Sequence, residues 1–486
     1  MSQTDGPKPH ELLNLYINYY LGKEKRRNDE FEVRFGTNRY NSLTKIDFDN
    51  IVEKLKSLGF TSDNSQGTYT LNVSNEYDDP KTGRKKMGNI RTSIKSLPAI
   101  EKYCKDNNLS EENIFEPIYN GNVEFLQKFR KKVKIEGEEK EVSLSPIDFR
   151  DFEFRINYKS EVTLTIENKG SFKVKNLLND WSNQKKTFRL IKRYSYTSDE
   201  LPFRIDCSIV KTSKKRKYFI SEYTVEQSEV FNNPENYEIE IELLNDKARR
   251  YSEEELTIML KNVIKIILSG WQQSSFPISF KEQKNIQDEY MKLIYGDKPL
   301  PKTKDGSKNR HIRPSDFIGP SSISLEVANI TQIDGDSNIP NINHKYSVTE
   351  KADGLRKLLF ISKIGKIYLI DTNMNIQFTG MVTKHRNVYN SIIDGEHVLY
   401  NKAGDFINLY LAFDIYYRNN ENYKGFPFIQ MEGLKYSDEK IAKDKFRLNG
   451  LNKFVKEIDT NCVVLDYDSP LKIQTKNFYT NLEEDT

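Results

Sequence analysis

The chain has 486 residues, of which 36% are hydrophobic and 30% are charged, and its formal net charge at pH 7 is +4. This length leaves room for two to four domains, and the composition is typical of a water-soluble globular protein with no stretch of about 18 apolar residues that could span a membrane. The polar N-terminus and the three widely spaced cysteines predict a protein without a signal peptide, in a reducing, cytoplasm-like compartment.

The first half of the sequence predicts a series of strands, because apolar and polar residues alternate between turn residues. Many of the alternating polar positions are charged, and in a closed barrel covered on its outer face these charges would line the interior. Helices are predicted over residues 12–21 and 46–58. The predicted strands are residues 31–35, 67–73, 89–95, 126–135, 152–158, 161–167, 188–196, 204–210, 218–225 and 237–244.

Basic residues gather in four clusters, at residues 84–86, 128–134, 185–193 and 211–217. Most such clusters are solvated faces. Their alternation with Phe, Tyr and Ile indicates that several of them lie on strands, with the cations on one side.

The pattern changes after residue 244. Ser252 is expected to cap a helix that runs to residue 269, with acidic residues in its first turn, where they favour the helix dipole. A second helix is predicted over residues 281–295, followed by a flexible join over residues 296–322. Strands are then predicted at residues 321–325, 357–362, 366–371, 391–400 and 408–416. We therefore expect an α+β protein with two domains, residues 1–275 and 276–486.

Two predicted strands carry several glutamates each. Residues 30–32 read Glu-Phe-Glu, and residues 238–242 read Glu-Ile-Glu-Ile-Glu. Like charges on one face of a strand repel each other, and Mg²⁺ or Mn²⁺ would remove that penalty because these hard cations prefer carboxylate oxygens. A wet acidic face on an edge strand would explain either strand alone. Two acidic strands that flank strands rich in Arg and Lys favour a site for a metal and phosphates.

This pattern resembles the tunnel-type, metal-dependent RNA triphosphatases of fungi and of the capping enzymes of large DNA viruses such as poxviruses, asfarviruses and mimiviruses. The resemblance implies an antiparallel β-barrel in which Glu30, Glu32 and Glu242 hold the metal. It also implies that Glu240 orients the attacking water.

Residues 204–208, Arg-Ile-Asp-Cys-Ser, match the family's Arg-x-Asp-x-Ser/Thr strand. The basic strand before it matches less well, because Lys192 and Arg193 are adjacent and cannot both point inward from a regular strand. The residues that the resemblance assigns to the triphosphate are Arg91, Arg155, Lys192, Arg193, Arg204, Asp206 and Glu238.

Residues 351–354 read Lys-Ala-Asp-Gly at a predicted strand end. A lysine there can attack an α-phosphate and carry a nucleotide, provided that a low-dielectric pocket or nearby cations lower its pKa. Asp-Gly-Glu at residues 394–396 and Phe-Asp at residues 413–414 follow inside apolar runs. Hairpins with Asp-Gly turns would explain either motif alone.

The three motifs in this order resemble motifs I, III and IIIa of the covalent nucleotidyltransferases, which have a ligase-type, ATP-grasp-like fold and include mRNA guanylyltransferases and polynucleotide ligases. The context of Lys351 and the pair Gly319-Pro320 resemble the guanylyltransferases of large DNA viruses more than ligases. The resemblance implies that Lys351 forms a covalent lysyl-GMP intermediate. The residues that it assigns to GTP binding are Asp353, Gly354, Arg356, Glu396, Phe413 and Asp414.

The family's motifs IV and V are not found at the expected positions. Residues 432–435 look like motif IV but follow Asp414 too closely, and residues 470–478 resemble the stretch that precedes it. We therefore expect poor formation of lysyl-GMP unless a longer product or a completing polypeptide supplies the rest. RNA polymerase and a methyltransferase are further partners that the resemblance implies.

The preferred interpretation is a bifunctional capping enzyme that removes the γ-phosphate of 5′-triphosphate RNA and then transfers GMP from GTP to the 5′-diphosphate. An ATP-dependent polynucleotide ligase with a polyphosphate-hydrolysing barrel is one alternative, and a triphosphatase with an inactive scaffold domain is another. The resemblance implies a cytoplasmic location, in a viral factory or a virion.

Overall fold

The computed structural model describes residues 29–36, 42–79, 82–130, 132–133, 142–143, 146–166, 171–296, 312–331, 339, 341–342, 346–430, 445–464 and 470–479. The helix predicted over residues 12–21 and the sequence at residues 432–435 lie outside the described residues. The chain divides into two compact units, Met1–Gln273 and Ser274–Thr486. No helix among the described residues is long and apolar enough to cross a membrane.

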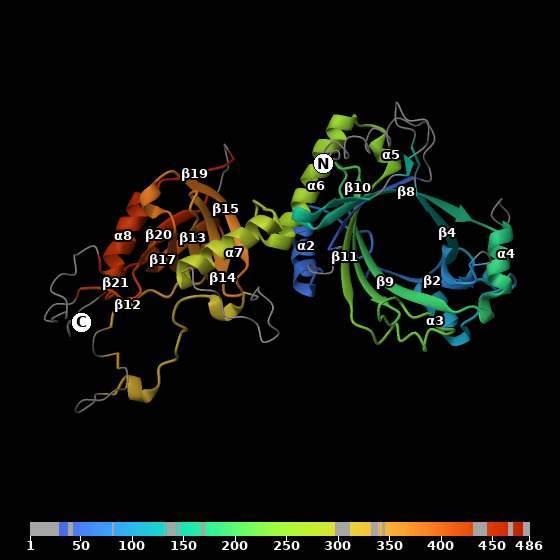
Figure 1. The fold of residues 1–486 in the computed structure, drawn as a ribbon, viewed down its shortest axis with the longest axis horizontal. Coiled ribbons are helices and arrows are strands. Elements are labelled where there is room, and N and C mark those ends of the chain that lie inside the picture. The colour runs from blue at the N-terminus through green and yellow to red at the C-terminus, as the bar shows by residue number, and fades with distance from the viewer. Residues whose placement is uncertain are drawn as a thin grey trace. The chain divides into compact units, whose positions relative to one another are not determined.

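The described residues of the first unit form a closed antiparallel barrel of eight strands (Figure 1). The strands follow the order β1-β11-β10-β9-β2-β3-β4-β8, and β8 pairs with β1 to close the ring. The α+β fold class with an N-terminal barrel is therefore confirmed. The barrel strands are β1 (Asp29–Phe35), β2 (Thr68–Asp78), β3 (Lys85–Lys95), β4 (Val123–Arg130), β8 (Phe154–Leu164), β9 (Lys186–Thr197), β10 (Phe203–Thr212) and β11 (Asn236–Leu243).

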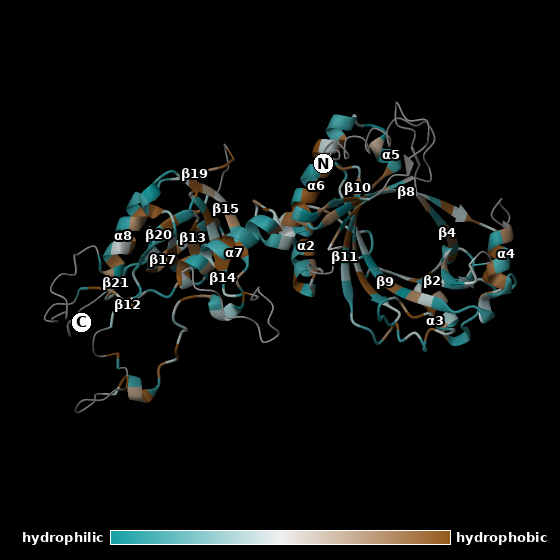
Figure 2. Cartoon of the chain, viewed as in Figure 1, coloured by the Kyte–Doolittle hydropathy of each residue, from teal (hydrophilic) through white to brown (hydrophobic). Residues whose placement is uncertain are grey.

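The outer face of the barrel is apolar and is covered by helices. On one side, α2 (Lys45–Ser57) and α6 (Glu253–Gln272) pack on buried residues of β1 and β11. Elsewhere α3 (Leu97–Asp106) and α4 (Ser171–Asn179) pack with strands that include β2 and β3. Figure 2 shows hydrophilic and hydrophobic residues along the same barrel strands. Because the apolar side chains point out under the helices, the charged ones point inward, as the alternation predicts.

Several elements of the first unit differ from the sequence-based prediction. Residues 152–158 and 161–167 belong largely to one continuous strand, β8, and residues 218–225 form a loop with isolated bridges instead of a strand. The helices α3 and α4 were not predicted. Ser252 caps α6 through a reciprocal capping box with Glu255, as expected. The remaining elements are β5 (Lys132–Val133), β6 (Val142–Ser143), β7 (Ile147–Phe149), α5 (Asn245–Ala248) and the 3₁₀ helices Asn113–Phe115, Arg150–Phe152 and Trp181–Asn183.

The second unit is a sheet with a helix packed on each face. The described strands follow the order β18-β17-β16-β13-β14-β15-β19, and β20 pairs in parallel with β17. Helix α7 (Phe280–Tyr295) packs on one face through Tyr290, and α8 (Arg447–Glu457) packs on the other through Phe454. The strands are β13 (Leu355–Ile361), β14 (Lys366–Asp371), β15 (Ile376–Thr383), β16 (Ser391–Tyr400), β17 (Phe406–Arg418), β18 (Glu421–Asn422), β19 (Thr460–Cys462) and β20 (Lys472–Thr475).

A separate two-stranded ladder joins β12 (Val348–Thr349) to β21 (Phe478–Tyr479). The unit also contains the 3₁₀ helices Pro314–Asp316, Val327–Asn329 and Arg386–Val388. Residues 321–325 do not form the predicted strand. They are exposed and pair with no other strand. Helix α7 belongs to the second unit, and the boundary between the units lies after Gln273, two residues from the one expected after residue 275 and outside the join predicted at residues 296–322.

Candidate active site

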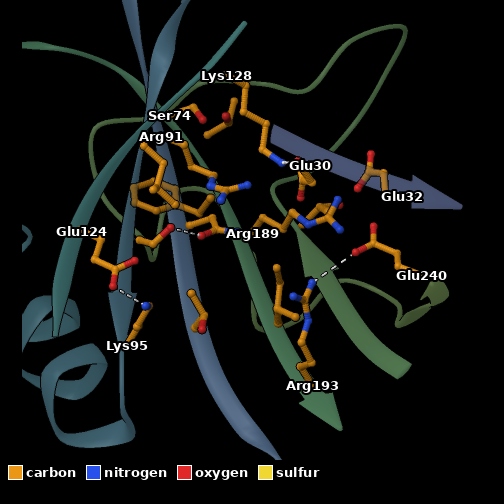
Figure 3. Close-up of a pocket in the computed structure, with 18 of the residues that line it drawn as sticks. Glu30, Glu32, Ser74, Arg91, Lys95, Glu124, Lys128, Arg189, Arg193 and Glu240 are labelled. Atoms are coloured by element: carbon orange, nitrogen blue, oxygen red, sulfur yellow. Dashed lines mark hydrogen bonds and ion pairs between the residues drawn. The ribbon is translucent and has the colours of Figure 1, made fainter. Parts of the chain in front are cut away.

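The barrel contains a cavity of ≈ 500 Å³ that is lined by side chains from all eight strands. Figure 3 shows acidic and basic side chains pointing into it from different strands. The cavity therefore combines groups that can bind a cation with groups that can bind phosphate. Its charged lining residues are Glu30, Glu32, Arg34, Arg91, Lys95, Glu124, Lys128, Lys159, Arg189, Arg193, Glu240 and Glu242.

The two acidic strands are direct neighbours, although they are the first and last strands of the barrel. In the antiparallel register of β1 and β11, Glu32 lies opposite Glu242, and Arg34 lies opposite Glu240. The side chains of directly opposite residues lie on the same face of a sheet. The glutamates that the sequence singled out are thus brought together on the inner face.

Each of the three carboxylates proposed to hold a metal contacts a cation in this structure. Burial raises the pKa of Glu242 to about 7, although the neighbouring Arg204 opposes that shift. Burial thus disfavours the carboxylate form compared with an exposed glutamate, and a further positive charge nearby would favour that form again. The pairs are Glu30–Lys128 at 2.7 Å, Glu32–Lys159 at 3.1 Å and Glu242–Arg204.

The donor set fits a hard divalent cation in its chemistry, because it offers carboxylate oxygens only. Within the described part of the chain, no three His, Cys, Asp or Glu side chains form a group that could already hold a metal ion. The oxygens are instead turned toward lysine and arginine. Binding of a metal would therefore require the carboxylates to exchange these partners.

Arg193, and not Lys192, faces the cavity. The Arg193 guanidinium donates a hydrogen bond to Asp206 at 3.0 Å, whereas the Lys192 ammonium lies 5.4 Å from the ring centroids of both Tyr69 and Tyr194. Neighbouring residues on a regular strand point to opposite sides. The structure therefore places Arg193, and not Lys192, in the lining of the cavity expected to hold the triphosphate.

Asp206 is buried and holds basic side chains of β9 and β10 in place. Only 1% of its side chain is exposed, and it accepts hydrogen bonds from Arg193, Arg204 and Ser195. A carboxylate in this position holds the two guanidinium groups side by side, and these groups also contact Ser208, Glu240 and Glu242. Asp206 thus orients cations and is itself shielded from a ligand.

The other predicted phosphate-binding residues take different positions. Arg91 lines the cavity and donates to Glu161 at 3.0 Å. Glu238 lines an adjoining cavity of ≈ 650 Å³. Arg155 is absent from the lining of both cavities, and its guanidinium is held by Asp148 of β7 at 2.6 Å. The placement of Arg155 therefore does not match the role assigned to it.

Sequence reasoning missed several cations and one acid of the cavity. Arg189 lies four residues before Arg193 on β9, lines both cavities and donates to Glu238 at 2.5 Å. Extending the period-two pattern from Arg193 would have identified it. The other residues that were missed are Lys95, Glu124, Lys128 and Lys159.

In the second unit, the three motifs come from one end of β13 and from the neighbouring strands β16 and β17. Lys351 lies between β12 and β13 and is exposed, as are Asp353 and Gly354. The described residues therefore do not enclose the lysine in the low-dielectric pocket that is one of the two ways to lower its pKa. Arg356 lies directly opposite Glu396 in the β13–β16 register.

Arg356 is held on the sheet by a buried carboxylate. It donates to both oxygens of Asp394, at 3.1 and 2.6 Å, and to the carbonyl of Pro320 at 2.7 Å. Asp394 is fully buried and also accepts a hydrogen bond from Tyr416 at 2.6 Å. The segment around Gly319 approaches this cluster closely, since a Cβ there would lie 2.5 Å from the Arg356 guanidinium.

The acids of the other two motifs are also paired. Glu396 accepts from Lys476 at 3.3 Å, and the Lys476 ammonium lies 5.4 Å from the ring centroid of Phe413. Asp414 accepts from Arg447 at 2.8 and 3.2 Å. Burial raises the pKa of Asp414, and Arg447 opposes the shift. Arg356, Glu396 and Asp414 thus each form a separate ion pair, and all three residues lie on the neighbouring strands β13, β16 and β17.

A buried polar network lies next to these motifs. The Lys357 ammonium donates to Gln377 at 2.6 Å and lies 3.3 Å from Nδ1 of His397, whose Nε2 is 2.8 Å from Oδ1 of Asn408. Burial lowers the pKa of Lys357 to about 8 and that of His397 to about 4. The uncharged imidazole can therefore accept a hydrogen bond at Nδ1 from the Lys357 ammonium, which keeps its proton because its pKa is the higher of the two.

Comparison with known proteins finds that part of the chain is similar to mRNA-capping enzymes. Residues 253–481 match the family model for the catalytic domain of the mRNA capping enzyme. A protein of Acanthamoeba polyphaga mimivirus described as a probable mRNA-capping enzyme is 28% identical over 237 residues, which are 49% of this chain. That match spans only 16% of the mimivirus protein.

Solved structures of the RNA triphosphatase Pct1 from S. pombe are also similar to part of the chain. One covers 54% of this chain and 94% of its own, with 14% sequence identity and a TM-score of 0.29. The structure of Pct1 in complex with the Spt5 CTD has 13% identity and a TM-score of 0.28. The family model and the mimivirus relative together confirm that this chain resembles the mRNA-capping enzymes of large DNA viruses.

Proposed function

We propose that the chain acts in mRNA 5′ capping and that its barrel hydrolyses the γ-phosphate of 5′-triphosphate RNA. The observation that carries this proposal is the convergence of glutamates from β1 and β11 with arginines and lysines from the other strands in one cavity. The similarity of residues 253–481 to capping enzymes supports the proposal, because the diphosphate product would be the acceptor for GMP transfer.

In this proposal Glu30, Glu32 and Glu242 would hold Mg²⁺ or Mn²⁺, which when bound would neutralise charge on the γ-phosphate. Lys128 and Lys159 now contact two of these carboxylates and would be released to bind phosphate oxygens. Charge-assisted hydrogen bonds from positioned cations stabilise the charge that develops in phosphoryl transfer.

Glu240 would accept a hydrogen bond from the attacking water and orient its oxygen toward the γ-phosphorus. As that bond forms, the bond between the γ-phosphorus and the β–γ bridging oxygen breaks. The products are inorganic phosphate and an RNA 5′-diphosphate, and the water proton passes to the phosphate products. Arg193 would remain oriented by Asp206 throughout.

Two variants test the barrel activity. Glu32→Ala or Glu242→Ala should reduce γ-phosphate release about a thousandfold, since removal of a ligand raises the barrier by several kcal/mol. Glu53→Ala is the matched control and should retain γ-phosphate release, because Glu53 is an exposed glutamate of helix α2 outside the cavity. Retained activity in both ligand variants, or phosphate release that persists in excess EDTA, would contradict the proposal.

We also propose that the second unit transfers GMP through Lys351. Its support is the connected position of Arg356, Glu396 and Asp414 on adjacent strands. GTP would have to displace Lys476 from Glu396 to reach that carboxylate. Transfer of label from α-³²P-GTP to the protein would support a guanylyltransferase, label from α-³²P-ATP would favour a ligase, and label from neither would favour a scaffold.

The proposed substrates are 5′-triphosphate RNA and GTP. A methyltransferase, RNA polymerase and a completing C-terminal polypeptide remain proposed partners. The proposed location is cytoplasmic, in a viral factory or a virion, in keeping with the mimivirus relative.

A further inference from the structure

A basic and aromatic hairpin follows β10 at one end of the barrel. A bridge between Lys215 and Phe219 closes it, and the Ile220 amide donates to the Lys214 carbonyl at 3.0 Å. The five residues from Lys215 to Phe219 read Lys-Arg-Lys-Tyr-Phe, and all of them are exposed. We refer to residues 215–219 as the mouth hairpin.

The mouth hairpin lies where the barrel cavity opens into the adjoining cavity. Phe219 lines both cavities, as do Arg189 and Thr212. Lys215 lines the adjoining cavity. A chain that leaves the barrel cavity at this end would therefore pass Arg189 and then the mouth hairpin.

The cations of the mouth hairpin are not neutralised by neighbouring acids. Lys214, just before it, lies 3.8 Å from both Glu222 and Glu229. By contrast, Lys215, Arg216 and Lys217 form no ion pair with any described residue. The hairpin therefore presents three consecutive positive charges to solvent.

Large aromatic rings are exposed beside these charges. Tyr218 is 73% exposed and Phe219 is 47% exposed. The Lys215 ammonium lies 4.9 Å from the Phe219 ring centroid, and the Lys217 ammonium lies 5.6 Å from that of Tyr218. Rings on which bases stack, next to cations that contact phosphates, are the two parts of a surface that binds single-stranded nucleic acid.

We propose that the mouth hairpin binds the RNA strand immediately downstream of the triphosphate. Lys215, Arg216 and Lys217 contact backbone phosphates, and bases stack on Tyr218 and Phe219. The inference rests on the proposed triphosphatase function and extends it, because such contacts favour a polynucleotide over a free nucleoside triphosphate. Stacking and phosphate contacts read no base edges, so this binding is independent of sequence.

The test compares two substrates in one variant, Arg216→Ala/Lys217→Ala/Tyr218→Ala, which leaves the Lys215–Phe219 bridge in place. Loss of one stacking ring and two cations should raise the KM for a 5′-triphosphate oligonucleotide at least about tenfold. The KM should also depend less steeply on salt. Free ATP has no further nucleotides that could contact the mouth hairpin. The KM for its hydrolysis should therefore stay within about twofold of the wild-type value.

The matched control is Lys261→Ala/Lys265→Ala, which removes two exposed cations from helix α6 and should change neither substrate. An unchanged KM for RNA in the triple variant would overturn the inference and leave the triphosphatase proposal intact. An equal loss for RNA and ATP would also overturn it, because the hairpin would then serve the barrel itself.

If the wild-type protein hydrolyses neither substrate, the triphosphatase proposal fails and the inference is judged by binding alone. Fluorescence anisotropy with a 5′-hydroxyl single-stranded RNA then measures the hairpin directly. Weaker binding by the triple variant than by the α6 control supports the surface, and equal binding refutes it.

Discussion

Replacing Asp206 by asparagine tests whether a buried carboxylate holds the cations of the barrel cavity in place. Oδ1 of Asp206 accepts from Ser195 at 2.6 Å and from Nε of Arg204 at 3.0 Å. Oδ2 accepts from Arg193 at 3.0 Å and from Arg204 at 3.2 Å. Asparagine retains the first acceptor, but its NH₂ group would face two guanidinium groups, which can only donate.

The magnitude follows from the contacts that are lost. Two charge-assisted hydrogen bonds disappear, each of about 1.5–3 kcal/mol, and breaking a buried charge pair costs about 3–5 kcal/mol. Arg193 keeps a contact to Glu240 at 3.3 Å, so we expect a loss of roughly 3 kcal/mol in the unfolding free energy of the first unit. γ-Phosphate release should fall at least about tenfold, because Arg193 is no longer fixed.

The assay uses the positions of the tryptophans. The chain has two, Trp181 and Trp271, and both belong to the first unit, so their fluorescence during urea unfolding reports that unit. Asp148→Asn is the matched control, since Asp148 also accepts twice from Arg155, at 2.6 and 3.0 Å, but on an exposed surface. Its loss should stay below about 1 kcal/mol. Equal losses in the two variants, or wild-type phosphate release by Asp206→Asn, would refute the reasoning.

Three further predictions concern the second unit. Lys351→Ala should abolish labelling by α-³²P-GTP and leave γ-phosphate release unchanged, because the two sites belong to separate units; a parallel loss of phosphate release would contradict this. Gly319→Ala should destabilise the second unit by about 1–3 kcal/mol, because φ of Gly319 is +121° and the new Cβ would lie 2.7 Å from the Tyr416 hydroxyl. Hydrogen exchange of the β13 amides measures this loss, and protection equal to that of the wild type would contradict the prediction. Burial lowers the pKa of His397 from 6.5 to about 4, so the unfolded chain binds more protons between these values and stability falls as the pH falls through them. His397→Asn should lessen that loss by roughly 2 kcal/mol between pH 7 and pH 5 in urea unfolding followed by circular dichroism, and equal pH slopes in both proteins would count against it.

Period-two alternation predicted most of the barrel because each strand has one face under helices and the other in a charged cavity. The same signal was misleading at residues 218–225, where aromatic residues alternate with polar ones in an exposed loop. It could not decide between Lys192 and Arg193, since a shift of one residue exchanges the two faces of a strand. That choice depends on the pairing of β9 with β10, which places Arg193 opposite Ser208.

Other features of the sites depend on long-range contacts and could not be read from local sequence. The ion pairs Glu396–Lys476 and Asp414–Arg447 join segments that meet only in the folded second unit. The Glu32–Glu242 juxtaposition was inferred from a family resemblance and not from the chain's own pattern. Local sequence fixes which face of a strand is polar, whereas strand pairing decides which polar residues meet.

The seam between β1 and β11 has a consequence for how the protein is made on the ribosome. The acidic residues of β1 emerge early in synthesis, but their hydrogen-bonded neighbours in β11 are among the last of the barrel to be translated. Closing so long a loop is entropically unfavourable and slow, and contacts of high sequence separation are typically late in folding. One edge of β1 therefore stays unpaired in the nascent chain until β11 has been translated. A fragment that ends before residue 236 lacks the β11 side of the cavity.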